Sequence, residues 1–185
     1  RVVPLHEAEI TLSFEHDNAD DHIHWINELA SRPLPVSASL WHRGQSHLRL
    51  SGTEQGMGSA RKLLGGGVVQ QDWESVAEQR HEFFKPGQVV SRISLPPTTA
   101  KLDTMDPCLI EWGGAQRWLC GDVNITRLRT QIDAINGTVC AFRHHPRGVV
   151  VFHTLPEAML ALQCRIKSRF DPAGIFNPGK MYPGI

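Results

Sequence analysis

Several basic side chains in this chain of 185 residues could take part in chemistry. Arg92 and Arg117 lie in predicted strands, where a guanidinium group can point at a fixed target and hold a carboxylate by two parallel hydrogen bonds. His144 and His145 are adjacent in a predicted loop, and either could serve as a base or a metal ligand. Adjacent loop residues point in different directions, so we expect at most one to serve and choose His144. The competing interpretation for each residue is a solvated surface position.

The C-terminal segment 171–185 is a second candidate site because it contains two stiff turns. Asp171–Gly174 has the residues of a type I turn, and Asn177–Lys180 has the Pro-Gly pair of a type II turn. Ile175 and Phe176 between the turns are apolar, and we expect them to be buried against something. A Pro-Gly turn lets main-chain amides approach a ligand closely, and the flanking Asn and Lys add side-chain donors. The alternative is a loop that only locks one domain onto another.

Charge and cysteine content argue against several classes of protein. The 19 basic residues balance 19 acidic ones, whereas nucleic-acid and membrane-surface binders need a basic excess. Four scattered cysteines form no Cys-x-x-Cys pair, which favours reduced thiols and a cytoplasmic protein. No apolar run is long enough for a transmembrane helix, and no signal peptide is visible. The chain begins with Arg1 and lacks an initiator Met, which suggests a piece of a longer protein.

The spacing of apolar residues predicts two similar halves joined by a linking helix. The first half is expected to contain a strand over 2–14 and a helix capped by Asp20 or Asp21. Hairpin strands at 36–41 and 47–51 and a helix capped by Thr53 and ended by Gly65–Gly67 should follow. A polar helix over 72–84 is expected to link the halves. The second half is then expected to contain a strand at 89–95 and strands at 108–112 and 115–120 around Gly113-Gly114. A helix capped by Asp122 or Asn124, strands at 139–142 and 149–153, and a helix opened by a capping box at Thr154–Glu157 should follow.

Hairpins require antiparallel pairing, and the helices between strands must then cover one face of the sheet. The expected fold class is therefore α+β, an antiparallel sheet with helices on one face in which a ferredoxin-like unit is roughly duplicated. We expect residues 1–185 to form a single cap-type domain. Its expected parts are subdomains at 1–70 and 88–170 and a C-terminal tail at 171–185.

The segment Phe170–Lys180 resembles the closing motif of FAD-linked oxidases of the vanillyl-alcohol oxidase type. The segments 41–52, 73–80, 92–97 and 110–119 are similar to the smaller flavin-type subunit of bacterial complexes that oxidise 2-hydroxy acids such as glycolate. This resemblance covers nearly the whole chain and implies a C-terminal cap domain with a ferredoxin-like sheet. Because Gly65–Gly67 does not join a strand to a helix, we expect the FAD-binding domain to lie outside this chain.

The resemblance implies an oxidoreductase subunit that turns glycolate into glyoxylate, with FAD bound mainly by the missing N-terminal half. It implies two partners, a second flavin-type subunit and an iron–sulfur subunit that receives the electrons. It also implies a cytoplasmic localisation, which could include the inner face of the membrane through the partner subunits. The fragment alone would be inactive. The tail residues expected near the flavin are Phe176, Asn177, Pro178, Gly179 and Lys180.

In such a reaction Arg92 and Arg117 would hold the substrate carboxylate, and His144 would take the hydroxyl proton. Glu111 could form a cross-strand ion pair with Arg117. Related dehydrogenases bind a metal through paired His and a Glu, but no matching motif occurs here, so no metal site is expected. Two alternatives therefore stay open: a non-catalytic assembly subunit of such a complex, and an oxidase for a different 2-hydroxy acid.

Overall fold

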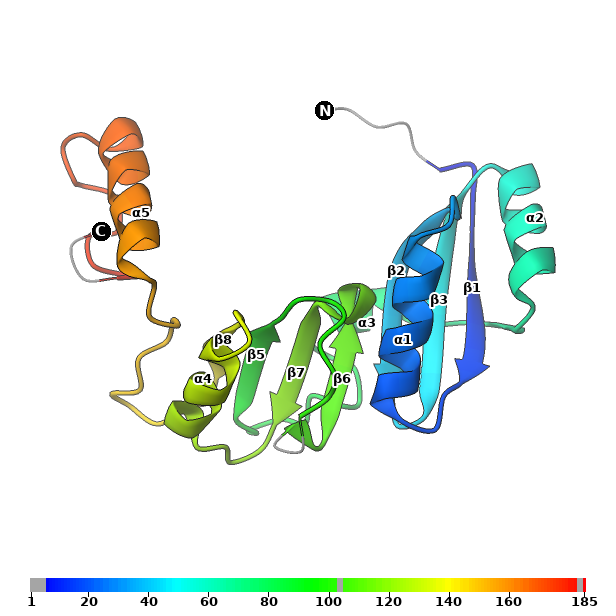
Figure 1. Ribbon diagram of the computed structural model, residues 1–185, viewed down its shortest axis with the longest axis horizontal. Helices are drawn as coiled ribbons and strands as arrows, with labels where there is room; N and C mark the ends of the chain where they lie inside the picture. Colours follow the sequence, from blue (N-terminus) through cyan, green and yellow to red (C-terminus); the bar gives the residue numbers. More distant parts are fainter. Residues whose placement is uncertain (1–5, 103–104, 183–184) are drawn as a thin grey trace.

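A single antiparallel sheet organises the computed structural model, which describes residues 6–102, 105–182 and 185 (Figure 1). Its eight strands follow the order β4-β1-β3-β2-β6-β7-β5-β8. The first half of the chain supplies β1 (Ala8–Glu15), α1 (Ala19–Ala30), β2 (Val36–His42), β3 (Gln45–Gly52), α2 (Glu54–Leu64) and β4 (Gly67–Val69). The second half supplies α3 (Trp73–Ala77), β5 (Val90–Ser94), β6 (Cys108–Glu111), the 3-10 turn η2 (Trp112–Gly114), β7 (Gln116–Cys120), α4 (Ile125–Asp133), β8 (Thr138–Arg143) and α5 (Glu157–Phe170).

The sheet is a duplication of one ferredoxin-like unit. The first unit runs β1-α1-β2-β3-α2-β4 and its strands lie in the order β4-β1-β3-β2. The second unit has the same strand pattern, β8-β5-β7-β6 when read from the opposite edge, with α4 before its last strand. Strands β2 and β6 join the units through the pairs Leu40–Glu111 and Trp41–Ile110. These findings confirm the expected α+β class and the duplicated antiparallel sheet.

The second unit departs from the first in the connection between its first two strands. The described residues of the segment 95–107 form no α-helix, whereas α1 occupies this place in the first unit. The segment is held by neighbours instead: the Asn27 side chain of α1 donates to the Pro97 carbonyl at 3.1 Å, and the Lys101 main-chain amide donates to Asp20 at 2.6 Å. The first unit therefore helps to position the second.

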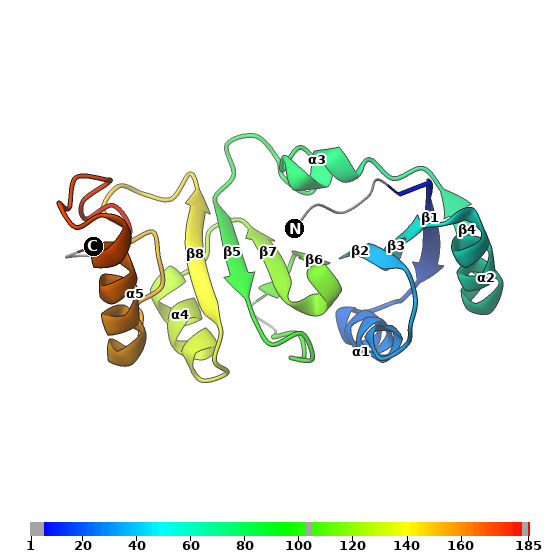
Figure 2. The same cartoon turned by 90° about the horizontal axis from the view of Figure 1, so that it is seen from above.

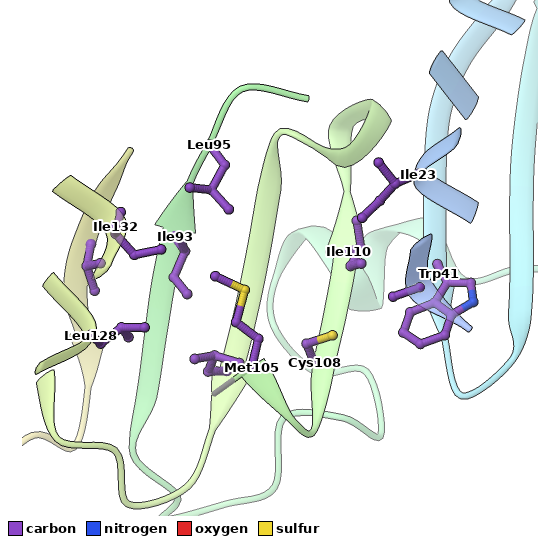
Figure 3. Packing of buried hydrophobic residues seen from close by; sticks show 12 residues of the cluster. Ile23, Trp41, Ile93, Leu95, Met105, Cys108, Ile110, Leu128 and Ile132 are labelled. Atoms are coloured by element: carbon purple, nitrogen blue, oxygen red, sulfur yellow. The ribbon is translucent and has the colours of Figure 1, made fainter. Parts of the chain in front are cut away.

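Helices α1, α2 and α4 lie against one face of the sheet, and α3 with the following residues crosses the other (Figure 2). One core cluster spans both units on the helix side. Figure 3 shows Ile23 and Trp41 of the first unit beside Ile110 of the second, and the cluster continues to Leu128 and Ile132 of α4. On the opposite face, Phe83 and Phe84 pack against the sheet with Trp118.

Helix ends follow local capping chemistry, which confirms some predictions and corrects others. Thr53 caps α2 and Asn124 caps α4, both through side-chain oxygens that accept a main-chain N–H. Helix α1 is capped by Asn18 and not by Asp20 or Asp21, which occupy its first turn. The capping box expected at 154–157 does not form, because Pro156 is at the N-cap of α5 and makes no side-chain cap bond.

Two expected elements are shorter or irregular. The polar helix expected over 72–84 ends at Ala77, because Gln79 takes a left-handed φ of 50° and the chain then wraps onto the sheet. The strand expected at 149–153 does not form, although Ala141 of β8 donates to the Val151 carbonyl at 2.8 Å. Residues 2–5 of the first expected strand lie outside the described residues.

Helix α5 stands apart from the sheet at the end of the extended segment 144–156 (Figure 1). It has no buried residue, and its apolar stripe is exposed. The stripe and the tail after it form one surface, which we call the α5 apolar surface: Met159, Leu162, Ile166, Phe170, Ile175, Phe176 and Met181.

Candidate functional site

Arg117 lies on β7 and points to the side of the sheet that α1 and α4 cover. Its strand partners are Ile93 and Ile110, and its exposed fraction is 0%. The guanidinium donates to three main-chain carbonyls, those of Gly114 at 3.2 Å, Ala100 at 3.0 Å and Thr99. Burial lowers the pKa of the Arg117 guanidinium. The Arg117 side chain therefore holds the segment 95–107, which occupies the place that α1 has in the first unit.

The expected ion pair between Glu111 and Arg117 is wrong. Glu111 is paired across the hairpin with Gln116, so its carboxylate projects on the face opposite to Arg117. There it accepts hydrogen bonds from the Gln116 amide at 2.5 Å and the Trp118 indole at 2.6 Å. Successive strand residues alternate between faces, and this alternation separates the two charges.

Arg92 lies on β5 and faces the side of the sheet opposite to Arg117. Its strand partners are Trp118 and Cys140, and its guanidinium lies 5.9 Å from the centre of the Phe142 ring. The Nε atom is buried and has no hydrogen-bond partner. The buried Nε atom cannot reach a ligand, but the side chain as a whole is only half-buried, so Arg92 remains a candidate for the carboxylate.

His144 follows β8 directly and is exposed at the rim of a cavity beside Arg143. Its φ of 55° is left-handed, which is uncommon for a residue with a side chain. The neighbouring His145 has a different environment, because its Nε2 lies 3.1 Å from the Val90 carbonyl and 3.2 Å from the Ser91 hydroxyl. The two imidazoles therefore diverge, and His144 is the one with access to the cavity.

The sequence interpretation passed over Arg143, which the structure places in the same cavity as His144. Its guanidinium lies 5.6 Å from the centre of the Phe142 ring, so Arg143 and Arg92 both contact one aromatic side chain. A β-bulge between Val90 and Ser91 shifts the register, so that Val90 pairs with Arg143 and Ser91 with Ala141. No sequence pattern marks this bulge, which brings Arg143 to the cavity.

The C-terminal tail has the predicted turns. Gly174 donates to the Asp171 carbonyl at 3.1 Å and Lys180 to the Asn177 carbonyl at 3.2 Å, which closes one turn in each place. The Asp171 carboxylate accepts the main-chain amides of Ile175 and Phe176 at 3.1 and 2.9 Å. Ile175 and Phe176 were expected to be buried but are 69% and 64% exposed, since no described residue covers them.

The tail turns fit the edge of a flavin site but not a complete one. Phe176–Lys180 are all exposed, and Asn177 and Gly179 have left-handed φ angles of 47° and 67° that turn the chain sharply. The glycines Gly65–Gly67 link α2 to β4, so they do not form a phosphate loop between a strand and a helix. The described residues could therefore hold FAD only from one side, through the Asn177 amide and the Lys180 ammonium.

Other reactive groups are few in the described part of the chain. Within residues 6–102, 105–182 and 185, no three His, Cys, Asp or Glu side chains gather as metal ligands. The same residues include no helix that is long and apolar enough to cross a membrane. Burial raises the pKa of the Cys108 and Cys120 thiols to about 11, so neither is a ready nucleophile at neutral pH.

Comparison with known proteins confirms the resemblance to a subunit of bacterial glycolate oxidase. One relative is glycolate oxidase subunit GlcE of Escherichia coli (strain K12), with 32% identity over 183 residues. The match covers 98% of this chain and 51% of GlcE, so the chain spans about half the length of that relative. No family model and no solved structure matches the sequence.

Proposed function

We propose that this chain is the cap domain of an FAD-dependent subunit in a complex that oxidises glycolate to glyoxylate. The observation that carries the proposal is the similarity to a glycolate oxidase subunit along nearly the whole chain. The tail adds support, because its two rigid turns present Phe176, Asn177, Pro178, Gly179 and Lys180 outward. In the proposal these residues meet the flavin, which the N-terminal half of the longer polypeptide binds.

The bound flavin would supply a hydride acceptor, and the chain would hold and orient the substrate. Arg92 is proposed to fix the carboxylate, since its half-buried guanidinium forms no ion pair with any described carboxylate. His144 is proposed to accept the hydroxyl proton of the substrate at its exposed imidazole. We propose that Arg117 acts indirectly, because its guanidinium already donates to three main-chain carbonyls and shapes the second unit.

The proposed partners are a second flavin-type subunit and an iron–sulfur subunit that takes the electrons. The α5 apolar surface supports a role in assembly, because an exposed stripe of this size in water is costly and commonly marks a contact site. This observation also favours the second candidate function, a non-catalytic assembly subunit. An oxidase for a different 2-hydroxy acid is the third, and the substrate assay below separates it.

The visible absorption spectrum of the full-length polypeptide, purified with its natural partners, tests the proposal. We expect a flavin spectrum that glycolate bleaches under anaerobic conditions. A colourless polypeptide would contradict the flavin-subunit proposal. A flavin that lactate bleaches and glycolate does not would indicate another 2-hydroxy acid.

Variants of this chain separate the catalytic function from the assembly function. Replacing Arg92 with Gln is expected to raise the KM for glycolate, and replacing His144 with Gln is expected to lower kcat. Arg127→Gln is the matched control, because Arg127 is exposed on α4 across the sheet. If both variants keep the full kcat/KM of the unaltered complex, the proposed roles are wrong and the assembly function is favoured.

A further inference from the structure

A cavity of about 430 Å³ lies where the segment after α3 crosses the ends of β5 and β8. Its walls carry three cationic side chains, Arg80, Lys85 and Arg143, the imidazoles of His81 and His144, and Glu82 as the acidic member. Phe84 and Val90 line the apolar part of the wall. A concave site with an apolar wall and a few converging polar groups is the usual form of a small-molecule site.

Arg143 is held in position at this cavity. Its guanidinium donates to the Gln79 side-chain oxygen at 3.2 Å and to the Gln79 carbonyl at 3.5 Å. The face of the group lies against the Phe142 ring, which further restricts its orientation. An arginine whose fork is oriented before binding loses little conformational entropy when a carboxylate arrives.

The cations around the cavity are incompletely neutralised. Arg80 forms an ion pair with Glu74 at 2.9 Å, and Glu82 lies 4.0 Å from the His42 imidazole. Within the described residues, no carboxylate lies within 4.0 Å of the nitrogens of Arg143 or Lys85. A small anion in the cavity would therefore find positive charge that the chain itself does not balance.

Two residues that line the cavity adopt unfavourable main-chain angles. Gln79 and His144 have φ values of 50° and 55°, although neither is a glycine. Gln79 positions Arg143, and His144 follows Arg143 in the chain. Left-handed conformations of such residues cost free energy and often occur at ligand sites. Here both of them serve to shape one cavity.

We propose that this cavity binds a small carboxylate anion, with Arg143 as its principal clamp and His144 beside it. The cavity and its charge carry the inference that the ligand is a carboxylate. That this carboxylate is the 2-hydroxy acid substrate rests on the proposed function. Arg143 would then be a specificity-determining residue that acts inside the cavity, whereas Arg92 contacts the same Phe142 ring but does not line the cavity.

Binding of acetate to the full-length polypeptide tests the site, because acetate has a carboxylate but no hydroxyl to be oxidised. Nuclear magnetic resonance of the arginine side-chain and histidine ring signals reports where acetate binds. We expect acetate to shift the signals of Arg143 and His144, and Arg143→Gln to weaken its affinity about ten-fold or more. Arg143→Lys keeps the charge without the fork and should fall between the two.

Arg127→Gln on α4 is the matched control and should bind acetate as the unaltered polypeptide does, because Arg127 is exposed and remote from the cavity. Unchanged Arg143 and His144 signals at saturating acetate would overturn the inference. Equal acetate affinity in Arg143→Gln would overturn it as well. Since all of these side chains are exposed, the variants are expected to fold.

The outcome for this site can be separated from the outcome for the proposed function. Acetate binding that depends on Arg143 in a polypeptide without flavin would support the carboxylate site while the proposed function fails. If glycolate bleaches the flavin and Arg143→Gln leaves its KM unchanged, the proposed function stands. In that case the assignment of Arg143 to the substrate is overturned.

Discussion

The two ferredoxin-like units have different side chains at equivalent buried positions of the sheet. In the first unit, Ser46 is the second residue of the return strand of the hairpin and pairs with Trp41; in the second, Arg117 has this position and pairs with Ile110. Both side chains are 0% exposed on the face that the helices cover. A small hydroxyl fits beneath α1, whereas a long guanidinium fills the space where the second unit has no corresponding helix.

The two units also differ in whether their buried nitrogen-containing side chain carries a charge. In the first unit His22 of α1 lies 2.8 Å from the Ser46 hydroxyl, and burial lowers the pKa of His22 to about 3. In the second unit Arg117 keeps its charge and donates to main-chain carbonyls. A helix satisfies its own carbonyls, but an irregular segment does not, so the second unit needs a donor with several N–H groups.

The largest effect of a substitution at neutral pH should come from removing that donor. Arg117→Met removes the fully buried guanidinium that donates to the carbonyls of Thr99 and Ala100, and we expect it to lower the free energy of unfolding by about 3 kcal/mol. Chemical denaturation of the full-length polypeptide measures the change. Arg92→Met is the matched control on the opposite face and should cost less than about 1 kcal/mol. Equal losses for the two variants would contradict the structural role of Arg117.

The stability of the first unit is expected to depend on pH through His22. The pKa of His22 is 6.5 in its ordinary state and about 3 in the folded chain. As the pH falls from about 6.5 to about 3, the unfolded chain takes up a proton at His22 that the folded chain does not. The contribution of His22 to stability is therefore complete above the ordinary pKa and is lost with acidification, by on the order of 5 kcal/mol in total.

His22→Gln keeps a polar partner for Ser46 but cannot titrate, so it should flatten the loss of stability between these pH values. Denaturation curves at a series of pH values provide the measurement. His24→Gln is the control, because His24 is exposed on the same helix. If His22→Gln loses stability on acidification as steeply as the unaltered chain, other groups account for the dependence.

The hairpin glycines of the two units should respond differently to the same substitution. Gly44 and Gly114 both have left-handed φ angles, of 82° and 94°. A Cβ atom at Gly114 would lie 2.5 Å from the Pro97 carbonyl oxygen, whereas the nearest atom to one at Gly44 is 3.8 Å away. Thermal denaturation should show a loss of about 1 kcal/mol for Gly44→Ala and about 2 kcal/mol or more for Gly114→Ala. A reversed order would mean that the segment 95–107 moves away easily.

Much of this architecture is predictable because local chemistry and tertiary packing agree. Alternating apolar residues define the strands, and Thr53 and Asn124 cap helices. Gly113 and Gly114 both take left-handed angles, but the loop between the strands covers residues 112–115 and not the two glycines alone. The helix expected over 72–84 fails because periodicity alone cannot show that Phe83 and Phe84 leave the helix to cover the sheet.

The candidate site was less predictable, since residue type does not reveal the face of a strand. Arg92 and Arg117 looked equivalent in sequence, but strand pairing sends them to opposite faces of the sheet. In the sequence Arg143 is marked only as the residue before the two histidines. The β-bulge that brings Arg143 to the cavity wall is visible only in the structure. Register and bulges depend on long-range pairing, so such distinctions require three-dimensional information.

The tail belongs to neither unit, and the smallest effect is expected there. Lys167 of α5 donates to Asp171 at 2.6 Å and also to the Phe176 carbonyl, so one carboxylate and one ammonium hold both turns. The hydrogen bond from Lys167 lowers the pKa of Asp171, so the carboxylate is ionised at neutral pH and the tail should keep its shape there. Since α5 has no buried residue, losing this arrangement should leave the two units intact.

Asp171→Asn should speed hydrogen exchange at the amides of Ile175 and Phe176 several-fold, because a neutral side chain with one oxygen cannot hold both N–H groups and the Lys167 ammonium. Mass spectrometry of peptides from the tail measures this rate, and Glu157→Gln in the exposed first turn of α5 is the control. The midpoint of global denaturation should not change. A lower midpoint would show that the tail supports the sheet, and the separation between the units and the tail would then be wrong.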